Sequence, residues 1–258
     1  MKKIFLAFTM GSLCAVSWAQ GEELKVAIDP RYPPLIFKTA DGKLTGFDFD
    51  IANALCEEIK RKCVFVEQDW SGMIPNLLAK KYDAIICTMS ITEDRLKLVD
   101  FSYKYYKTPR RIMLKDPLKK EINYTSPASI KGKKIGVLKA STQEKYAMGE
   151  LKPAGVEVIV YDLQEQIYLD IKAGRLDGTV ARLEVISDFL NKHSADGYQL
   201  VGPALFIPKY FGTGVGVTLR KGQGPLKEQI NAAIKTLRAN GKYKAINDKY
   251  FKFDAYGI

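Results

Sequence analysis

The chain has 258 residues, of which 40 are Lys or Arg and 29 are Asp or Glu, which gives a formal net charge of +11. The lysines are scattered through amphipathic segments, and neither a nucleic-acid-binding motif nor a zinc-ligand spacing accompanies the charge. The composition therefore argues against a nucleic-acid-binding protein and indicates a solvated basic surface.

The first 19 residues have the pattern of a secretory signal peptide. Two lysines precede a mostly apolar run over residues 4–16, and residues 17–19 form a small-x-small cleavage site. The apolar run is too short to span a bilayer, and no later run is long enough. We therefore predict cleavage after Ala19 and a soluble, exported, periplasmic product.

Strand-like and helix-like segments then alternate, which is typical of an α/β protein with mostly parallel sheets. In chain order, the first part predicts strands over Leu24–Ile28, Val64–Val66 and Ala84–Ile86, with a helix over Phe47–Lys60 and another opening after Thr92. The second part predicts strands over Lys134–Leu138, Val156–Tyr161 and Leu176–Val180, with helices over Gln143–Leu151, Gln164–Ala173 and Glu184–Lys192. Two final helices are expected near Pro225–Asn240 and Lys242–Tyr250.

A weak internal repeat indicates two lobes of similar design. The stretch Leu77–Ala84 recurs in outline as Asp170–Gly178, where a helix ends on basic or small residues and an apolar residue and an aspartate lead into a strand. In such folds ligands bind beyond the carboxyl ends of parallel strands. Four of these ends carry polar or aromatic residues, at 29–32, 87–90, 139–142 and 181–182, so we expect a ligand cleft between the lobes.

The loop and helix start at Thr88–Arg95 combine hydroxyls, free backbone N–H groups and a guanidinium. That combination is suited to holding a carboxylate. The alternative is that Thr92 only caps the helix and Arg95 is a solvated surface charge. Because three other strand-end loops are expected at the same cleft, we favour the anion site.

The cysteines fit an exported chain, in which disulfides can form. Cys56 and Cys63 lie seven residues apart, at the end of one predicted helix and the start of the next strand, and two such residues alone make a poor zinc site. Cys87 is left single, and the one histidine, His193, sits in a distant polar helical end, so a catalytic Cys–His pair is not expected. We predict neither a metal nor a cofactor.

Short motifs spread over the mature chain carry a family resemblance. They are Gly46–Ala52 with Leu55-Cys56, Met73–Leu77, Ser90–Thr92, Lys131–Lys133, Thr142-Gln143, Gly174–Asp177 and Lys249–Phe251. Together they make the chain resemble the periplasmic solute-binding proteins of the polar amino-acid uptake family, above all the lysine/arginine/ornithine-, histidine- and opine-binding members. The Cys56/Cys63 pair matches a disulfide of that subfamily.

The resemblance implies an α/β fold of the type II periplasmic binding protein kind, with two mixed, mostly parallel sheets joined by two crossover strands. Lobe one would comprise residues 20–108 and 212–258, and lobe two residues 109–211, with crossovers near Tyr106–Arg110 and Tyr210–Gly214. The monomeric protein would close around a basic amino acid, of the arginine, lysine, ornithine or histidine type, and deliver it to the membrane permease of an ABC transporter.

The resemblance also implies roles at the ligand backbone. Arg95 would hold the α-carboxylate in a bidentate pair, helped by Ser90 and by the backbone N–H of Thr142. Thr88 and Ser90 would accept hydrogen bonds from the α-ammonium.

At the other end of the ligand, Asp29 would meet a cationic side chain flanked by Tyr32 and Trp70 through cation–π contacts. The alternatives are a turn role for Asp29 before Pro30 and ordinary core packing for the two aromatics. The complete predicted ligand-binding set is Asp29, Tyr32, Trp70, Cys87, Thr88, Ser90, Arg95, Leu138, Ser141, Thr142 and Arg182.

One position departs from the family pattern. Where the family has an aspartate that receives the α-ammonium, this chain has Arg182, with Glu184 two residues later. Three explanations are open: the alignment slips so that Glu184 reaches the site, Arg182 points into solvent, or the ligand carries a second anionic group. The third would suit an opine-type ligand held by Arg95 and Arg182.

Two other classes of protein fit the sequence less well than a binding protein. Relatives with this fold include cyclohexadienyl dehydratases, which need an acid placed to protonate a leaving hydroxyl, and no carboxylate with such a role can be argued from the sequence. A receptor sensor domain would require a separate membrane partner. We therefore expect a binding protein and not an enzyme.

Overall fold

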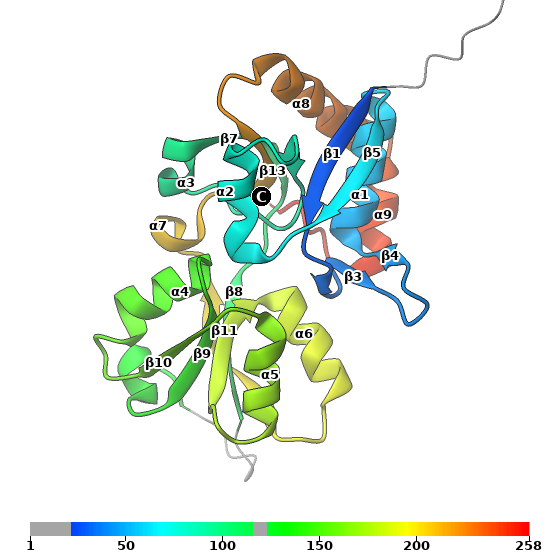
Figure 1. Ribbon diagram of the computed structural model, residues 1–258. Coiled ribbons are helices and arrows are strands. Elements are labelled where there is room, and N and C mark those ends of the chain that lie inside the picture. Colours follow the sequence, from blue (N-terminus) through cyan, green and yellow to red (C-terminus); the bar gives the residue numbers. More distant parts are fainter. Residues whose placement is uncertain (1–21, 116–122, 258) are drawn as a thin grey trace, which may run out of the picture.

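The computed structural model describes residues 22–115 and 123–257. The predicted signal peptide lies outside these residues. The chain forms two α/β lobes that lie one above the other in Figure 1, each built on a five-stranded sheet. We call the lobe that contains the first strand lobe one and the other lobe two.

Lobe one is built on a mixed sheet with the order β5-β1-β6-β13-β7. Its strands are β1 (Glu23–Ile28), β5 (Lys62–Glu67), β6 (Ala84–Ile85), β7 (Val99–Tyr106) and β13 (Val215–Arg220). β1 runs parallel to β5 and β6, whereas β13 is antiparallel to β6 and β7. A small antiparallel sheet of β2 (Arg31–Tyr32), β3 (Ile36–Lys38) and β4 (Leu44–Thr45) follows β1.

Among the described residues, the α-helices of lobe one are α1 (Phe47–Glu58), α2 (Met73–Leu78), α3 (Glu93–Leu98), α8 (Gly224–Ala239) and α9 (Lys242–Tyr250). In α1, Phe47, Ile51 and Leu55 recur every four residues and are buried in the lobe-one core, as expected for an amphipathic helix. Gly46 precedes α1 with a positive φ of 120°, and a Cβ there would overlap the backbone of Leu35. The tight entry into α1 therefore requires glycine.

Lobe two repeats the design of lobe one with the sheet order β10-β9-β11-β8-β12. The strands are β8 (Arg110–Lys115), β9 (Lys134–Leu138), β10 (Glu157–Tyr161), β11 (Gly178–Arg182) and β12 (Tyr198–Leu205). Again the first three strands in the order are parallel and the last two pairings are antiparallel. The helices are α4 (Thr142–Tyr146), α5 (Gln164–Lys172) and α6 (Leu183–Lys192).

Two connections join the lobes. The chain leaves lobe one between β7 and β8, through residues 107–109, and returns between β12 and β13, through the short helix α7 (Pro208–Phe211). β13 then inserts between β6 and β7, so the end of the chain completes the sheet that its beginning started. The two-lobed, mixed α/β fold that the sequence predicts is therefore confirmed.

Most predicted elements lie within two residues of the observed ones, with two differences. The predicted helix Gln143–Leu151 is split into α4 and a π-helix over Ala147–Leu151. The strand predicted over Leu176–Val180 is β11, which is shifted by two residues to Gly178–Arg182. Cys56 and Cys63 form the predicted disulfide, with Cα atoms 5.8 Å apart.

Candidate functional site

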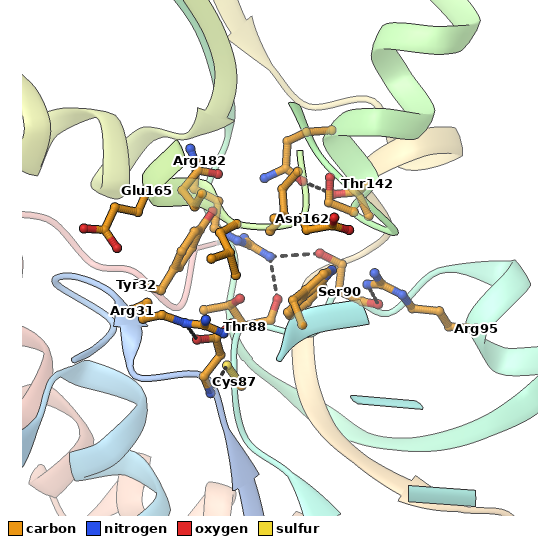
Figure 2. A pocket seen from close by; sticks show the side chains of 17 residues that line it. Arg31, Tyr32, Cys87, Thr88, Ser90, Arg95, Thr142, Asp162, Glu165 and Arg182 are labelled. Carbon is orange, nitrogen blue, oxygen red and sulfur yellow. Dashed lines mark hydrogen bonds and ion pairs between the residues drawn. The ribbon is translucent and has the colours of Figure 1, made fainter. Parts of the chain in front are cut away.

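A cavity lies between the lobes, and all eleven residues predicted for the ligand site line it (Figure 2). Most of them lie at or just beyond the carboxyl ends of the parallel strands β1, β5, β6 and β9 or at the end of β11. Arg95 lies in the first turn of α3. Six further residues line the cavity and were not predicted: Arg31, Gln143, Asp162, Leu163, Gln164 and Glu165. Opposed strand ends of the two lobes thus form one site, as the strand-end argument predicts.

The loop after β6 is held in place by a buried acid, Asp48 on α1. One carboxylate oxygen accepts from the backbone N–H of Thr88 at 2.7 Å, and the other accepts from the Tyr105 hydroxyl at 3.0 Å. Thr88 has a positive φ of 52°, so this bond supports a strained turn. Burial raises the pKa of Asp48 to about 7. The sequence analysis did not assign Asp48 a role, although it lies in the motif at Gly46–Ala52.

The raised pKa of Asp48 predicts a pH-dependent stability. The folded protein keeps this proton up to about pH 7, whereas the unfolded chain releases it near pH 4, so the unfolding free energy should fall as the pH rises between these values. We expect a fall of more than about 1.4 kcal/mol, the equivalent of one pKa unit. Urea titrations at pH 5 and pH 7.5 measure it. Asp48→Asn should flatten the profile and the exposed control Glu58→Gln should not; an unchanged profile in Asp48→Asn would refute the assignment.

Arg95 lies at the edge of the cavity and contacts both lobes. Its guanidinium donates to the Ser90 carbonyl at 3.1 Å and to the Ala140 carbonyl of lobe two at 3.3 Å, and it lies 5.5 Å from the centre of the Trp70 ring. Burial lowers its pKa to about 10, which leaves it charged at neutral pH. Thr92 also caps α3 by accepting from the Arg95 backbone N–H at 3.4 Å. Thr92 therefore caps the helix while Arg95, three residues later, lines the cavity.

Asp29 faces the cavity but already has a cationic partner. Arg31 makes a two-pronged ion pair with its carboxylate, at 2.7 and 3.0 Å, and also contacts Asp69. The Asp29 backbone N–H donates to Cys87 Sγ at 3.3 Å, which places the buried thiol in the cavity wall as predicted. Arg31 was missed because its role depends on a pairing that only the turn after β1 creates.

Arg182 points into the interior between the lobes. It is only 3% exposed, and its Nη2 donates to the Thr88 carbonyl at 2.8 Å and to Ser90 Oγ at 2.9 Å (Figure 2). Glu184 is also buried but is not among the cavity-lining residues; it accepts from the Thr108 hydroxyl at 2.9 Å. The structure thus rules out a solvent-facing Arg182 and a register slip that would bring Glu184 into the cavity.

The lobes touch across the cavity. Trp70 of lobe one donates to the Ala140 carbonyl at 3.3 Å, and Lys145 on α4 pairs with Asp94 on α3. These contacts, with those of Arg95 and Arg182, hold the two sides of the cavity together. The arrangement can enclose a small polar ligand in a volume from which water is largely excluded, where charge-assisted hydrogen bonds are strong.

The described residues contain neither a candidate metal site nor a candidate membrane span. No group of three or more His, Cys, Asp or Glu residues in this part of the chain could hold a metal ion. None of its helices has the length and apolar character that crossing a bilayer requires.

Two similar lobes, two connections and a polar cavity between them define a type II periplasmic binding protein fold. Residues 24–253 match the family model of bacterial extracellular solute-binding proteins, family 3, and the chain belongs to this family. It is 48% identical to an L-arginine-binding protein of Pseudomonas aeruginosa, over all of this chain and 99% of that one. It is 38% identical to a histidine-binding periplasmic protein of Salmonella typhimurium, over the full length of both. Among solved structures, an ancestral arginine-binding protein bound to arginine superposes with a TM-score of 0.82, at 34% identity, over 90% of this chain and 99% of that chain.

Proposed function

We propose that this protein is the substrate-binding component of an amino-acid ABC importer, which captures a ligand built on a basic amino acid and delivers it to a membrane permease. The observation that carries the proposal is the meeting of Arg95, Ser90 and Thr142 with Asp29 in one interlobe cavity. A guanidinium and hydroxyls at one end suit a carboxylate, and a carboxylate at the other suits a cation. The arginine- and histidine-binding relatives support the same ligand class.

Within this proposal each group has a chemical role. Arg95 holds the α-carboxylate with help from Ser90 and Thr142, while Tyr32 and Trp70 flank the ligand side chain. Asp29 receives its cationic end, because a carboxylate held by Arg31 still has lone pairs free for a second donor. Leu138 and Ser141 complete the wall on the lobe-two side.

Isothermal titration calorimetry with a ligand panel tests the function. We expect binding among arginine, lysine, ornithine, histidine and their α-nitrogen derivatives, and no measurable binding of leucine or glutamate. A folded protein that binds leucine or glutamate and none of the basic ligands would overturn the proposal.

Asp29→Asn should weaken binding of the tightest basic ligand about 10- to 100-fold, because a charge-assisted hydrogen bond contributes roughly 1.5–3 kcal/mol. Asp162→Asn is the matched control, since Asp162 also lines the cavity but its side chain is 71% exposed and paired with Lys139. Calorimetry on both variants decides the point. Equal losses in the two variants would contradict a specific role for Asp29.

The cellular setting is part of the proposal. We infer export by a signal peptide cleaved after Ala19, a monomer that meets no nucleic acid, and lobe boundaries at 108/109 and 211/212. The boundaries are supported by the ends of β7 and β8 and by α7 in the second connection. N-terminal sequencing of the secreted protein and its mass in solution test the first two points.

We infer a binding role and not a catalytic one. The acids that line the cavity are Asp29, which is paired with Arg31, and two residues at the rim, Asp162 and Glu165. The acid with a raised pKa, Asp48, is not a lining residue and both its oxygens are engaged. Incubation with prephenate or arogenate should give no product; turnover would contradict the inference.

A further inference from the structure

Two buried arginines meet at one hydroxyl in the middle of the molecule. Arg110 at the start of β8 and Arg182 at the end of β11 pair in the lobe-two sheet, and each is 3% exposed. Their Nη2 atoms donate to the same acceptor, Ser90 Oγ, at 2.8 and 2.9 Å, and Arg110 also donates to the Thr142 hydroxyl at 3.2 Å. Ser90, Thr142 and Arg182 line the cavity. Arg110 lies directly behind them, where it and Arg182 also line a neighbouring cavity beside the two connections between the lobes.

These two guanidinium groups have unused donors. Arg182 Nη1 and Arg110 Nε are buried and lack a hydrogen-bond partner. Within the described part of the chain, no ion pair joins either arginine to a carboxylate. The two nearby buried acids are directed elsewhere: Asp48 accepts from Thr88 and Tyr105, and Glu184 accepts from Thr108.

Buried cations without a paired anion are costly, because the charge has lost its water and gained no counter-charge at contact distance. A carboxylate placed against Arg110 and Arg182 would use their free donors and supply that counter-charge.

The same geometry disfavours a free ammonium at this point. Arg182 already donates to the Thr88 carbonyl and to Ser90 Oγ, two of the groups expected to accept from the α-ammonium of an amino acid. An unmodified α-ammonium would have to displace the guanidinium or lie next to two like charges. Like charges placed together in a desolvated site cost several kcal/mol.

We propose that Arg110 and Arg182 form a second anion subsite that binds a carboxylate attached to the α-nitrogen of the ligand. The inference rests on the proposed function. The substrate class is then a basic amino acid that carries a carboxylate-bearing group on its α-nitrogen, with its first carboxylate at Arg95 and its cationic end at Asp29. Arg110 is the residue that sequence analysis missed, because only the fold brings the first crossover to Ser90.

Calorimetry with three arginine ligands tests the subsite. The probes are L-arginine, Nα-acetyl-L-arginine, which removes the ammonium without adding a carboxylate, and octopine, which carries a carboxyethyl group on the α-nitrogen. We expect octopine to bind at least 100-fold more tightly than L-arginine and at least 10-fold more tightly than the acetyl derivative.

Variants assign the effect to the two arginines. Arg110→Gln and Arg182→Gln should each weaken octopine binding at least 10-fold, and Arg182→Asp should shift the preference toward L-arginine. Arg111→Gln is the matched control: Arg111 is the next residue on β8, but it donates to the Gly202 carbonyl at 2.8 Å, whereas Arg110 donates to the cavity residues Ser90 and Thr142. Circular dichroism verifies that each variant is folded. If Arg182→Asp is unfolded, the two glutamine variants still test the subsite.

The outcomes separate this inference from the proposed function. Binding of L-arginine as tight as that of octopine, or equal binding of octopine and acetylarginine, would overturn the subsite and leave the basic-ligand function standing. An octopine preference that survives in both glutamine variants would overturn the assignment to Arg110 and Arg182. If the folded protein binds none of the three ligands, both the subsite and the proposal that the protein binds arginine-type ligands are overturned.

Discussion

Replacing Arg95 with alanine is expected to weaken binding of the tightest basic ligand at least 100-fold while leaving the fold intact. The guanidinium lies between the lobes and contacts the carbonyls of Ser90 and Ala140, so it can hold a carboxylate and join the lobes at the same time. Truncating one partner of a desolvated charge pair costs about 2–5 kcal/mol or more, which corresponds to a loss of 30-fold or greater. We place Arg95 in the upper part of that range because its contacts reach both lobes.

Calorimetry on Arg95→Ala measures the loss, with Lys97→Ala as the control. Lys97 lies on the same helix, but its side chain is exposed and paired with Asp94. Binding by Arg95→Ala within threefold of the unaltered protein would show that the carboxylate of the ligand is held elsewhere. An equal loss in Lys97→Ala would point to general electrostatic attraction by the basic surface.

Gly178→Ala is expected to lower the unfolding free energy by more than about 3 kcal/mol, because overpacking against backbone cannot relax by a rotamer change. Gly178 begins β11, opposite Leu114 of β8, and a Cβ there would overlap the Met113 carbonyl oxygen and lie 3.0 Å from the Leu114 Cα. Arg182 ends the same strand. The variant should therefore lose ligand affinity as well as stability.

Urea unfolding measures the effect of Gly178→Ala, and Gly224→Ala is its control. Gly224 is the first residue of α8, and an added Cβ there would meet no atom within 4 Å. That variant should be neutral or slightly stabilising. A Gly178→Ala protein as stable as Gly224→Ala would mean that β8 and β11 pack less tightly than the structure describes.

The sequence predicts those parts of the fold that depend on local pattern. Helices such as α1 and α6 have one apolar face, and strands such as β9 are short β-branched or apolar runs, so both can be identified within a few residues. The short strands β2, β3 and β4, the longer strands β7, β8, β12 and β13, and the short helix α7 were not predicted, and of the short helix α2 only the end was predicted. Segments such as Arg110–Lys115, which opens with two arginines, become strands through their long-range partners and not through local pattern.

The residues of the candidate site can be divided in the same way, into those that local sequence predicts and those that depend on long-range partners. Strand-end loops are visible in the sequence, so the cavity-lining set could be predicted from them together with the family resemblance. The supporting residues could not, because each acts through a partner distant in the chain: Asp48 through Thr88, 40 residues away, and Arg110 through Ser90, 20 residues away. The first pairing exists only once lobe one has folded, and the second only once the two lobes lie against each other.

The central claim is that a ligand with a carboxylate binds in the interlobe cavity through Arg95. A crystal structure of the protein with the tightest basic ligand found by calorimetry tests it most directly. We predict that this ligand lies between β1, β6, β9 and β11, with a carboxylate within hydrogen-bond distance of the Arg95 guanidinium. A ligand bound outside this cavity, or a ligand inside it whose carboxylates do not contact Arg95, would contradict the account.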